Sequence, residues 1–300
     1  TCNLLNLDLK LSSIRDYFEN IENKESYIEF IFDKSKVDYT IMTNQIFNTY
    51  EIQQWEKNPK KSKHFKTSMR IDQLILDHEK CYQFIENYGY TPNLDGMTKY
   101  IEYWYHKLEP EYFMASLPYD FEFSDTNRNF GIENIIIPMA KKLNLPIAFK
   151  FGTQRGLNPE LREAGDSVGV ASVESLANLC KTYPKCKFLA TFLSQVNQHQ
   201  VCVIARKFGN LHIYGCWWYL NNPSLIEQLT RMRIEMMGLG FTIQHSDARV
   251  LEQLLYKWTH SKVVIKKVLI EKYQDLEKAG WKLSEKDINR DIYLLFRGSY

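Results

Sequence analysis

Seven short apolar runs, each long enough for one β-strand, alternate along this 300-residue chain with longer stretches of helical periodicity. Turn-forming or polar residues bound each run. The repeated order of strand and helix is typical of βαβ units, which build parallel sheets. The runs cover residues 37–43, 64–71, 112–117, 147–152, 188–193, 211–215 and 241–243. The sequence therefore predicts an α/β fold around a parallel sheet.

The stretches between the runs place apolar residues three and four positions apart, as one face of a helix requires. This spacing predicts helices over residues 97–108, 132–143, 173–183 and 223–237, and further helices before residue 37 and over residues 261–296. Ser172 is a suitable N-cap for the helix at 173–183, and Ser12 or Ser13 for the first helix of the chain. Pro223 favours a helix start and Gly238 a helix end.

Seven parallel strands fit either an open doubly wound sheet or a TIM-type (β/α)8 barrel that lacks one strand. A nucleotide-binding doubly wound sheet has a glycine-rich turn after its first strand, whereas the turn after residues 37–43 reads Asn-Gln-Ile-Phe. A barrel collects polar residues at the carboxyl ends of its strands. Such residues occur here at Asn44, Arg70, Asp72, Ser116, Ser194, Asn197, Trp217, Trp218, His245 and Asp247. The barrel is therefore the favoured architecture.

No long linker rich in glycine, proline or serine divides the chain. We expect a helical lead-in over residues 1–36, a barrel over 37–260, and a helical tail over 261–300 that packs on the barrel. The formal net charge of +2 gives no reason to expect nucleic acid or a membrane surface as a partner. The six cysteines form no CxxC pair and are expected to be reduced thiols. The sequence has no long apolar run and no signal peptide, so we expect a soluble cytoplasmic protein. Such a protein can form homo-oligomers.

The most informative segment for chemistry is QHSDAR at residues 244–249, which follows the last apolar run. A carboxylate such as Asp247 at the end of a barrel strand can bind a metal or transfer a proton. Arg249, two residues on, can hold a carboxylate by a bidentate pair. The same spacing equally suits Asp247 as a helix N-cap and Arg249 on the surface, and the spacing alone leaves both interpretations open.

Several segments, in order along nearly the whole chain, resemble the uronate isomerase family, in particular a divergent bacterial branch of it. The strongest are GCWWYLNNP at 215–223, TRMR at 230–233 and QHSDAR at 244–249, which resemble the last two barrel strands of these enzymes. Upstream, the similar segments are MTN at 42–44, MRID at 69–72, ASLP at 115–118, AGDSVG at 164–169, NQH at 197–199 and ARKF at 205–208. The tryptophan pair and HSDAR together are specific, and the shorter segments are weak on their own.

The resemblance implies an amidohydrolase-like barrel that interconverts an aldehyde sugar acid and its keto isomer, such as D-glucuronate and D-fructuronate or D-galacturonate and D-tagaturonate. It implies that Asp247 is a metal ligand, with zinc the expected metal, and the proton-transfer group. Arg249 and Arg70 would be cationic contacts to the substrate. Trp217 and Trp218 would wall the sugar pocket, and His245 would lie just outside the metal's ligands. We expect Arg70, Arg249 and Asp247 to face one cavity.

Three further polar residues have simpler explanations. His199 stands beside a helix start and is interpreted as a cap or a bridge between loops. Arg206 and Arg233 fall in helical patterns and are interpreted as salt-bridged structural residues.

One departure from the family pattern concerns the metal. These barrels carry His-x-His at the end of strand one, and this sequence contains no His-x-His. Its first recognisable strand resembles the family's second, so we expect the first strand and its histidines to be missing and the chain alone to bind zinc weakly and to be inactive. Two alternatives remain. A metal hydrolase on the same barrel would usually add histidines at strands five and six, where this chain reads KFG at 150–152 and LSQ at 193–195. A non-catalytic barrel that has lost its metal is the other.

Overall fold

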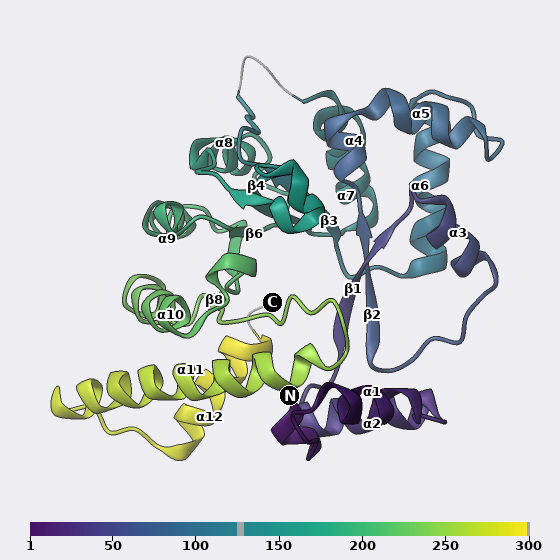
Figure 1. The fold of residues 1–300 in the computed structure, drawn as a ribbon. Coiled ribbons are helices and arrows are strands. Elements are labelled where there is room, and N and C mark those ends of the chain that lie inside the picture. The colour runs from purple at the N-terminus through teal and green to yellow at the C-terminus, as the bar shows by residue number, and fades with distance from the viewer. Residues whose placement is uncertain (125–128, 299–300) are drawn as a thin grey trace.

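The computed structural model describes residues 1–124 and 129–298, and its parallel strands follow one another across the sheet in chain order (Figure 1). The order is β1-β2-β3-β4-β6-β7-β8, with bounds Thr40–Gln45, Phe65–Arg70, Phe113–Pro118, Ile147–Gln154, Phe188–Phe192, Leu211–Tyr214 and Phe241–Thr242. A doubly wound sheet would reverse its order at a switch point. A strand order that never reverses is that of a (β/α) barrel, so the predicted fold class is confirmed.

Within the described residues this sheet holds seven parallel strands and is open, with β1 and β8 at its two edges. All seven predicted apolar runs form strands, with ends shifted by up to three residues. A short strand that the sequence analysis did not predict, β5 (Ser167–Val168), pairs antiparallel with the end of β4 through Thr153 and Gln154. It brings the segment after β4 back over the carboxyl end of the sheet.

The helices between the strands cover the outer face of the sheet (Figure 1). They are α3 (Thr49–Glu56), α4 (Asp72–Leu76), α5 (His78–Glu86), α6 (Leu94–Leu108), α7 (Ile137–Leu143), α8 (Val173–Thr182), α9 (Gln198–Ala205) and α10 (Pro223–Met237). A π-helical turn, η2 (Ile132–Ile136), leads directly into α7. Short 3-10 turns are η1 (Cys2–Leu5), η3 (Pro159–Gly165), η4 (Gln195–Asn197) and η5 (Trp218–Leu220).

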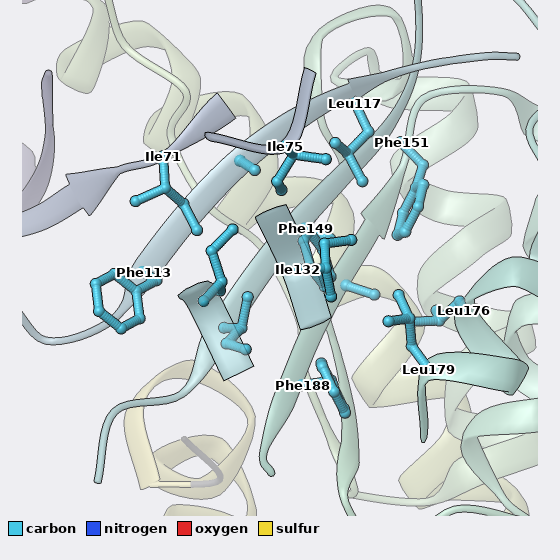
Figure 2. Packing of buried hydrophobic residues seen from close by; sticks show 14 of the residues in the cluster. Ile71, Ile75, Phe113, Leu117, Ile132, Phe149, Phe151, Leu176, Leu179 and Phe188 are labelled. Carbon is cyan, nitrogen blue, oxygen red and sulfur yellow. The ribbon is translucent and has the colours of Figure 1, made fainter. Parts of the chain in front are cut away.

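Alternation along the strands divides the side chains between two faces. In β4, Ile147, Phe149 and Phe151 point into the large core between sheet and helices, where Figure 2 shows Phe149 and Phe151 near Leu176 of α8. Ala148, one residue out of phase, packs instead in a small cluster on the concave face. That cluster consists of Met114, Ala148 and Leu189, with Tyr112 and Tyr214 packed against it. Because successive side chains of a strand point to opposite faces, Lys150 lies on the concave face as well.

The predicted helix caps are partly right. Ser172 accepts a hydrogen bond from the Ser175 amide at 3.2 Å and caps α8. Asn222 caps α10, which ends at Gly238 with a positive φ of 62°. The first helix is present as predicted, but its predicted cap is wrong, because α1 (Leu11–Glu19) follows Lys10 and takes Ser12 and Ser13 into its first turn. A side-chain cap contributes only about 1 kcal/mol, so it does not determine a helix start by itself.

Helices from the N-terminal and C-terminal parts of the chain pack against each other (Figure 1). There α2 (Lys24–Ser35) contacts α11 (Gln253–Lys278), and Leu5, Ile31 and Leu255 form a separate apolar cluster. The helix α11 continues without a break across residue 260, and α12 (Glu285–Tyr293) and the π-turn η6 (Leu294–Gly298) follow it. The division of the chain at residues 36 and 260 stays a prediction. Among the described ranges, no helix is both long and apolar enough to cross a membrane.

Candidate functional site

The candidate site lies on the concave face at the carboxyl ends of the strands, between β2, β4 and the segment after β8. Parallel strands bring these ends to one rim, and the register sets Lys150 of β4 beside Ser116 of β3 and Thr191 of β6. On β2, Arg70 stands beside Met114 of β3. Asp247 follows β8 and completes the site from the other edge of the sheet, since its carboxylate meets the ammonium of Lys150.

Asp247 is held in an unusual backbone conformation. Its φ is +46°, in the left-handed region that aspartate tolerates better than most other residues. The backbone carbonyl of Asp247 accepts a hydrogen bond of 2.5 Å from Lys257 Nζ of α11. The side-chain carboxylate of Asp247 faces the site, where its Oδ1 lies 3.7 Å from Lys150 Nζ. Such a strained position persists because the surrounding contacts hold it, and strain of this kind is frequent at functional sites.

Lys150 is a residue that the sequence analysis did not select. Its side chain is only 14% exposed, and its Nζ lies 5.4 Å from the ring centroid of Trp217, in cation–π range. Burial lowers the pKa of Lys150, the neighbouring Arg70 lowers it further, and the carboxylates of Asp247 and Asp72 raise it. The signal was present in the sequence: a lysine in the middle of an apolar strand can be retained only where a charge or a ligand meets it.

Arg70 is oriented by a carboxylate two residues on. Its Nε donates to Asp72 Oδ2 at 2.6 Å and its Nη2 to Oδ1 at 3.3 Å. Asp72 Oδ1 also accepts from the backbone amide of Ser116 at 2.6 Å, which ties the ends of β2 and β3 together. A bidentate pair of this kind fixes the plane of the guanidinium. Arg70 therefore reaches the site in one orientation, with N–H groups still available.

His245 is a neutral, closely packed side chain. Burial lowers its pKa to about 3, and nearby Lys150 adds to this, while Asp247 opposes it. The ring lies against Gly215, which follows β7: a Cβ added at Gly215 would stand 1.8 Å from His245 Cδ2. Gly215 also has a φ of +62°, which favours glycine. Both the space beside His245 and the backbone conformation therefore require glycine at this position. The structure places His245 next to Asp247 and packs its ring on Gly215, and the predicted role of His245 at the substrate stays a prediction.

A buried polar network locks the ends of β7 and β8. Gln244 Oε1 accepts from the amides of Cys216 (2.7 Å) and His245 (3.0 Å). Arg233 of α10, almost fully buried, donates to the Gly215 carbonyl at 2.7 Å and to Gln198 Oε1 at 2.8 Å. The expectation that Arg233 is salt-bridged is wrong, because its partners are a carbonyl and an amide oxygen. This network positions the turn that carries Trp217.

The rings of the two tryptophans lie 6.1 Å apart between centroids but have different further neighbours. Trp217 is buried under Lys150, whereas Trp218 stacks on Tyr219 with ring centroids 4.8 Å apart, outside that contact. Arg155 lies over the Trp218 ring at 5.9 Å and forms an ion pair with Asp166. Trp218 therefore contacts the rim loop after β4, and Trp217 lies next to the charged groups of the site.

The expectation that Arg249 points into the same cavity as Asp247 is wrong in this structure. The Arg249 side chain is 77% exposed and forms an ion pair of 3.2 Å with Glu163 of η3, itself 80% exposed. The backbone turns at Asp247, which sends the two side chains in different directions. Exposed pairs of this kind contribute little free energy. The role of Arg249 in substrate binding stays a prediction. His199 and Arg206 are likewise exposed.

In residues 1–124 and 129–298, no group of three or more histidine, cysteine, aspartate or glutamate side chains is arranged to hold a metal ion. A catalytic zinc ordinarily takes three protein ligands. The described residues therefore do not fit a complete zinc centre, and Asp247 meets an ammonium instead of other ligands. The predicted role of Asp247 as a metal ligand stays a prediction.

Among the solved structures that resemble the chain are three isomerases. A uronate isomerase from Bacillus halodurans C-125 has a TM-score of 0.94 and 38% identity, over 99% of this chain and 73% of that one. A uronate isomerase from Thermotoga maritima gives 0.71 and 14%, over 90% and 68% of the two chains. A glucuronate isomerase from Caulobacter crescentus gives 0.65 and 13%, over 90% and 64%. The last two likenesses concern the fold alone. No model of a protein family and no curated protein matches the chain.

Proposed function

This chain belongs to the uronate isomerase family, and from that membership we propose that the protein interconverts uronates with their keto isomers. The substrates would be D-glucuronate, giving D-fructuronate, or D-galacturonate, giving D-tagaturonate, or both. The likeness to the Bacillus halodurans enzyme, over almost all of this chain, carries the proposal.

The charge of the candidate site suits a sugar acid. Among the described residues, the electrostatic neighbours at Lys150 and Asp247 are the cations Arg70, Lys150 and Lys257 and the carboxylates Asp72 and Asp247. Basic side chains therefore outnumber carboxylates among these neighbours. We propose that Arg70, already oriented by Asp72, uses its remaining N–H groups to bind the substrate carboxylate. Binding energy from this remote group can orient the reacting carbons.

The reaction needs a base and a stabilised oxygen. Conversion of the aldose to the ketose breaks the C2–H bond, forms a C1–H bond, and turns the C1 aldehyde into a hydroxyl as the C2 hydroxyl becomes a ketone. We propose that the carboxylate of Asp247 accepts the C2 proton and returns it to C1. The hydrogen bond from Lys257 to the Asp247 backbone supports this placement.

The resemblance implies a divalent metal, which would act as a Lewis acid at a substrate oxygen when bound. Because the described residues do not assemble a set of three ligands, we derive no step through a metal. The proposed roles of Asp247, Arg70 and Trp217 concern the chain's own side chains alone.

The test is turnover of each uronate, with and without added zinc, followed by detection of the 2-keto sugar acid. Running the reaction in D2O should place deuterium at C1 of the ketose if a solvent-exchanging carboxylate carries the proton. If folded protein supplied with metal produces no ketose from either uronate, the isomerase proposal fails.

A further inference from the structure

The buried amino group of Lys150 has donor capacity that its neighbours do not use. A lysine ammonium has three N–H donors and no acceptor. Within the described parts of the chain, Nζ contacts the Asp247 carboxylate, whose Oδ1 lies 3.7 Å away, and the Trp217 ring, whose centroid lies 5.4 Å away, so Asp247 is its one acceptor. A group of this kind, on the concave face at the rim, is therefore placed to donate to a ligand.

The position of Lys150 decides which ligand atom it can reach. It lies beside the carboxylate of Asp247, whereas Arg70, at the end of β2, is turned toward Asp72 at the start of α4. A substrate whose carboxylate is bound by Arg70 and whose C2 proton is taken by Asp247 brings its C1 and C2 oxygens next to Lys150. These are the oxygens on which negative charge develops as the proton leaves.

Trp217 supports this placement. Its ring is buried, lies over the ammonium, and is held by the turn that Arg233 and Gln244 anchor. The side chain of Lys150 is only 14% exposed, so most of its aliphatic stem is removed from solvent. The donor is thus preorganised, and preorganised donors aimed at a developing oxyanion contribute most to the rate.

We propose that Lys150 is a catalytic residue of the isomerisation, whose amino group donates a hydrogen bond to the C1–C2 oxygens and stabilises the enediolate. This inference rests on the proposed function and extends it to a residue that no comparison assigns. The step balances without a further reagent, because the proton that leaves C2 resides on Asp247 and the electron pair on the enediolate oxygen. Lys150 makes and breaks no covalent bond.

The experiment compares wild type with Lys150→Met, which keeps the length of the side chain and removes the donor. The matched control is Lys66→Met, the same change on β2, at a lysine that pairs with Glu111 and lies over Tyr39. For Lys150→Met, kcat should fall roughly 10²-fold or more, the scale for losing one oxyanion donor, while KM changes little. Lys66→Met should match wild type. Lys150→Arg should recover part of the lost rate.

A binding measurement separates this inference from the isomerase proposal. Calorimetry would compare two inert ligands: a sugar diacid, and a sugar acid carrying a hydroxamate in place of C1 and C2, which mimics the enediolate. Lys150→Met should weaken the hydroxamate about tenfold more than the diacid. If wild type turns over no uronate, the isomerase proposal fails, and this comparison still decides the role of Lys150.

Two results would overturn the inference. One is a kcat for Lys150→Met within about threefold of wild type. The other is equal weakening of both inert ligands, which would make Lys150 a contact to the substrate carboxylate. Circular dichroism and thermal unfolding establish that each variant is folded. If Lys150→Met does not fold, Lys150→Gln takes its place in the same two comparisons.

Discussion

The ammonium of Lys150, in the middle of β4, lies 3.7 Å from a carboxylate oxygen of Asp247, in the segment after β8. The two residues are far apart in the sequence, and each is in an energetically unfavourable state: the lysine side chain is only 14% exposed, and the aspartate has a positive φ. Their proximity results from the strand register of the barrel. It brings the base that we propose and the donor that we infer to the same place on the rim.

Replacement of Asp247 by asparagine should abolish turnover and leave the fold intact. Asparagine keeps the shape and also tolerates the left-handed backbone, but it cannot accept the C2 proton. We expect kcat to fall roughly 10²-fold or more. Steady-state kinetics measure the loss, and near-UV circular dichroism checks the fold. Kinetics close to wild type would make Asp247 a structural residue.

The backbone at Asp247 permits a second test, which does not depend on activity. Alanine should destabilise the protein more than glycine at this position, by about 1 kcal/mol, because only glycine adopts a φ of +46° without a steric penalty. Urea unfolding of Asp247→Ala and Asp247→Gly gives the comparison directly, since both variants lose the carboxylate. Equal stabilities, or a more stable alanine variant, would show that this turn is relaxed in solution.

Replacement of Arg70 by methionine should raise KM for uronates more than it lowers kcat. Arg70 is oriented by Asp72, and we propose that it binds the remote carboxylate of the substrate, an interaction present before and during the reaction. Roughly a tenfold to 100-fold rise in KM is expected for a charge-assisted contact. An exposed arginine, Arg206→Met, serves as the control. A loss confined to kcat would instead place Arg70 at the reacting carbons.

Gly215→Ala should destabilise the protein by about 2 kcal/mol or more. The new Cβ would stand 1.8 Å from His245 Cδ2, and alanine is strained at a φ of +62°. The control is Gly209→Ala, where a Cβ has nothing within 4 Å. Chemical denaturation of the two variants beside wild type measures the difference. If both alanine variants unfold at the same urea concentration, His245 does not pack on Gly215 in solution.

The stability of the protein should fall as the pH is lowered from about 6.5 toward 4, in part through His212. Burial lowers the pKa of His212 to about 4, while histidine in an unfolded chain titrates near 6.5. Between these values the unfolded chain binds a proton that the folded protein does not, so the free energy of unfolding decreases with falling pH.

His212→Gln should flatten this part of the pH profile. Glutamine cannot titrate but can still hydrogen-bond Thr242, which His212 Nε2 contacts at 2.9 Å. Thermal unfolding of wild type, His212→Gln and the exposed control His199→Gln across this range makes the measurement. A slope for His212→Gln as steep as that of wild type would assign the acid sensitivity to other groups.

The sequence alone was sufficient to predict the order of the strands and helices along the chain. Strand-length apolar runs and helical spacing are local patterns, and each of the seven runs became a strand in the predicted order. Caps such as Ser172 and Asn222 were also local, because their side chains bond to the backbone three residues on. The segments around Trp217 and Asp247 were sufficient to identify the family, because a sequence resemblance depends only on the residues and their order.

Side-chain direction at the rim was decided by the tertiary structure. Spacing placed Arg249 beside Asp247, but the positive φ of Asp247 turned it toward Glu163 and solvent. Arg233 was predicted to be a salt-bridged helix residue, but in the structure it donates a hydrogen bond to the carbonyl of Gly215, after β7. Lys150 was overlooked because its partners, Asp247 and Trp217, come from the segments that follow two other strands, β8 and β7. Local sequence patterns determine whether a residue lies in a helix or a strand. The side chains that it contacts depend on the register between strands, which is set by the tertiary structure and cannot be read from a short segment.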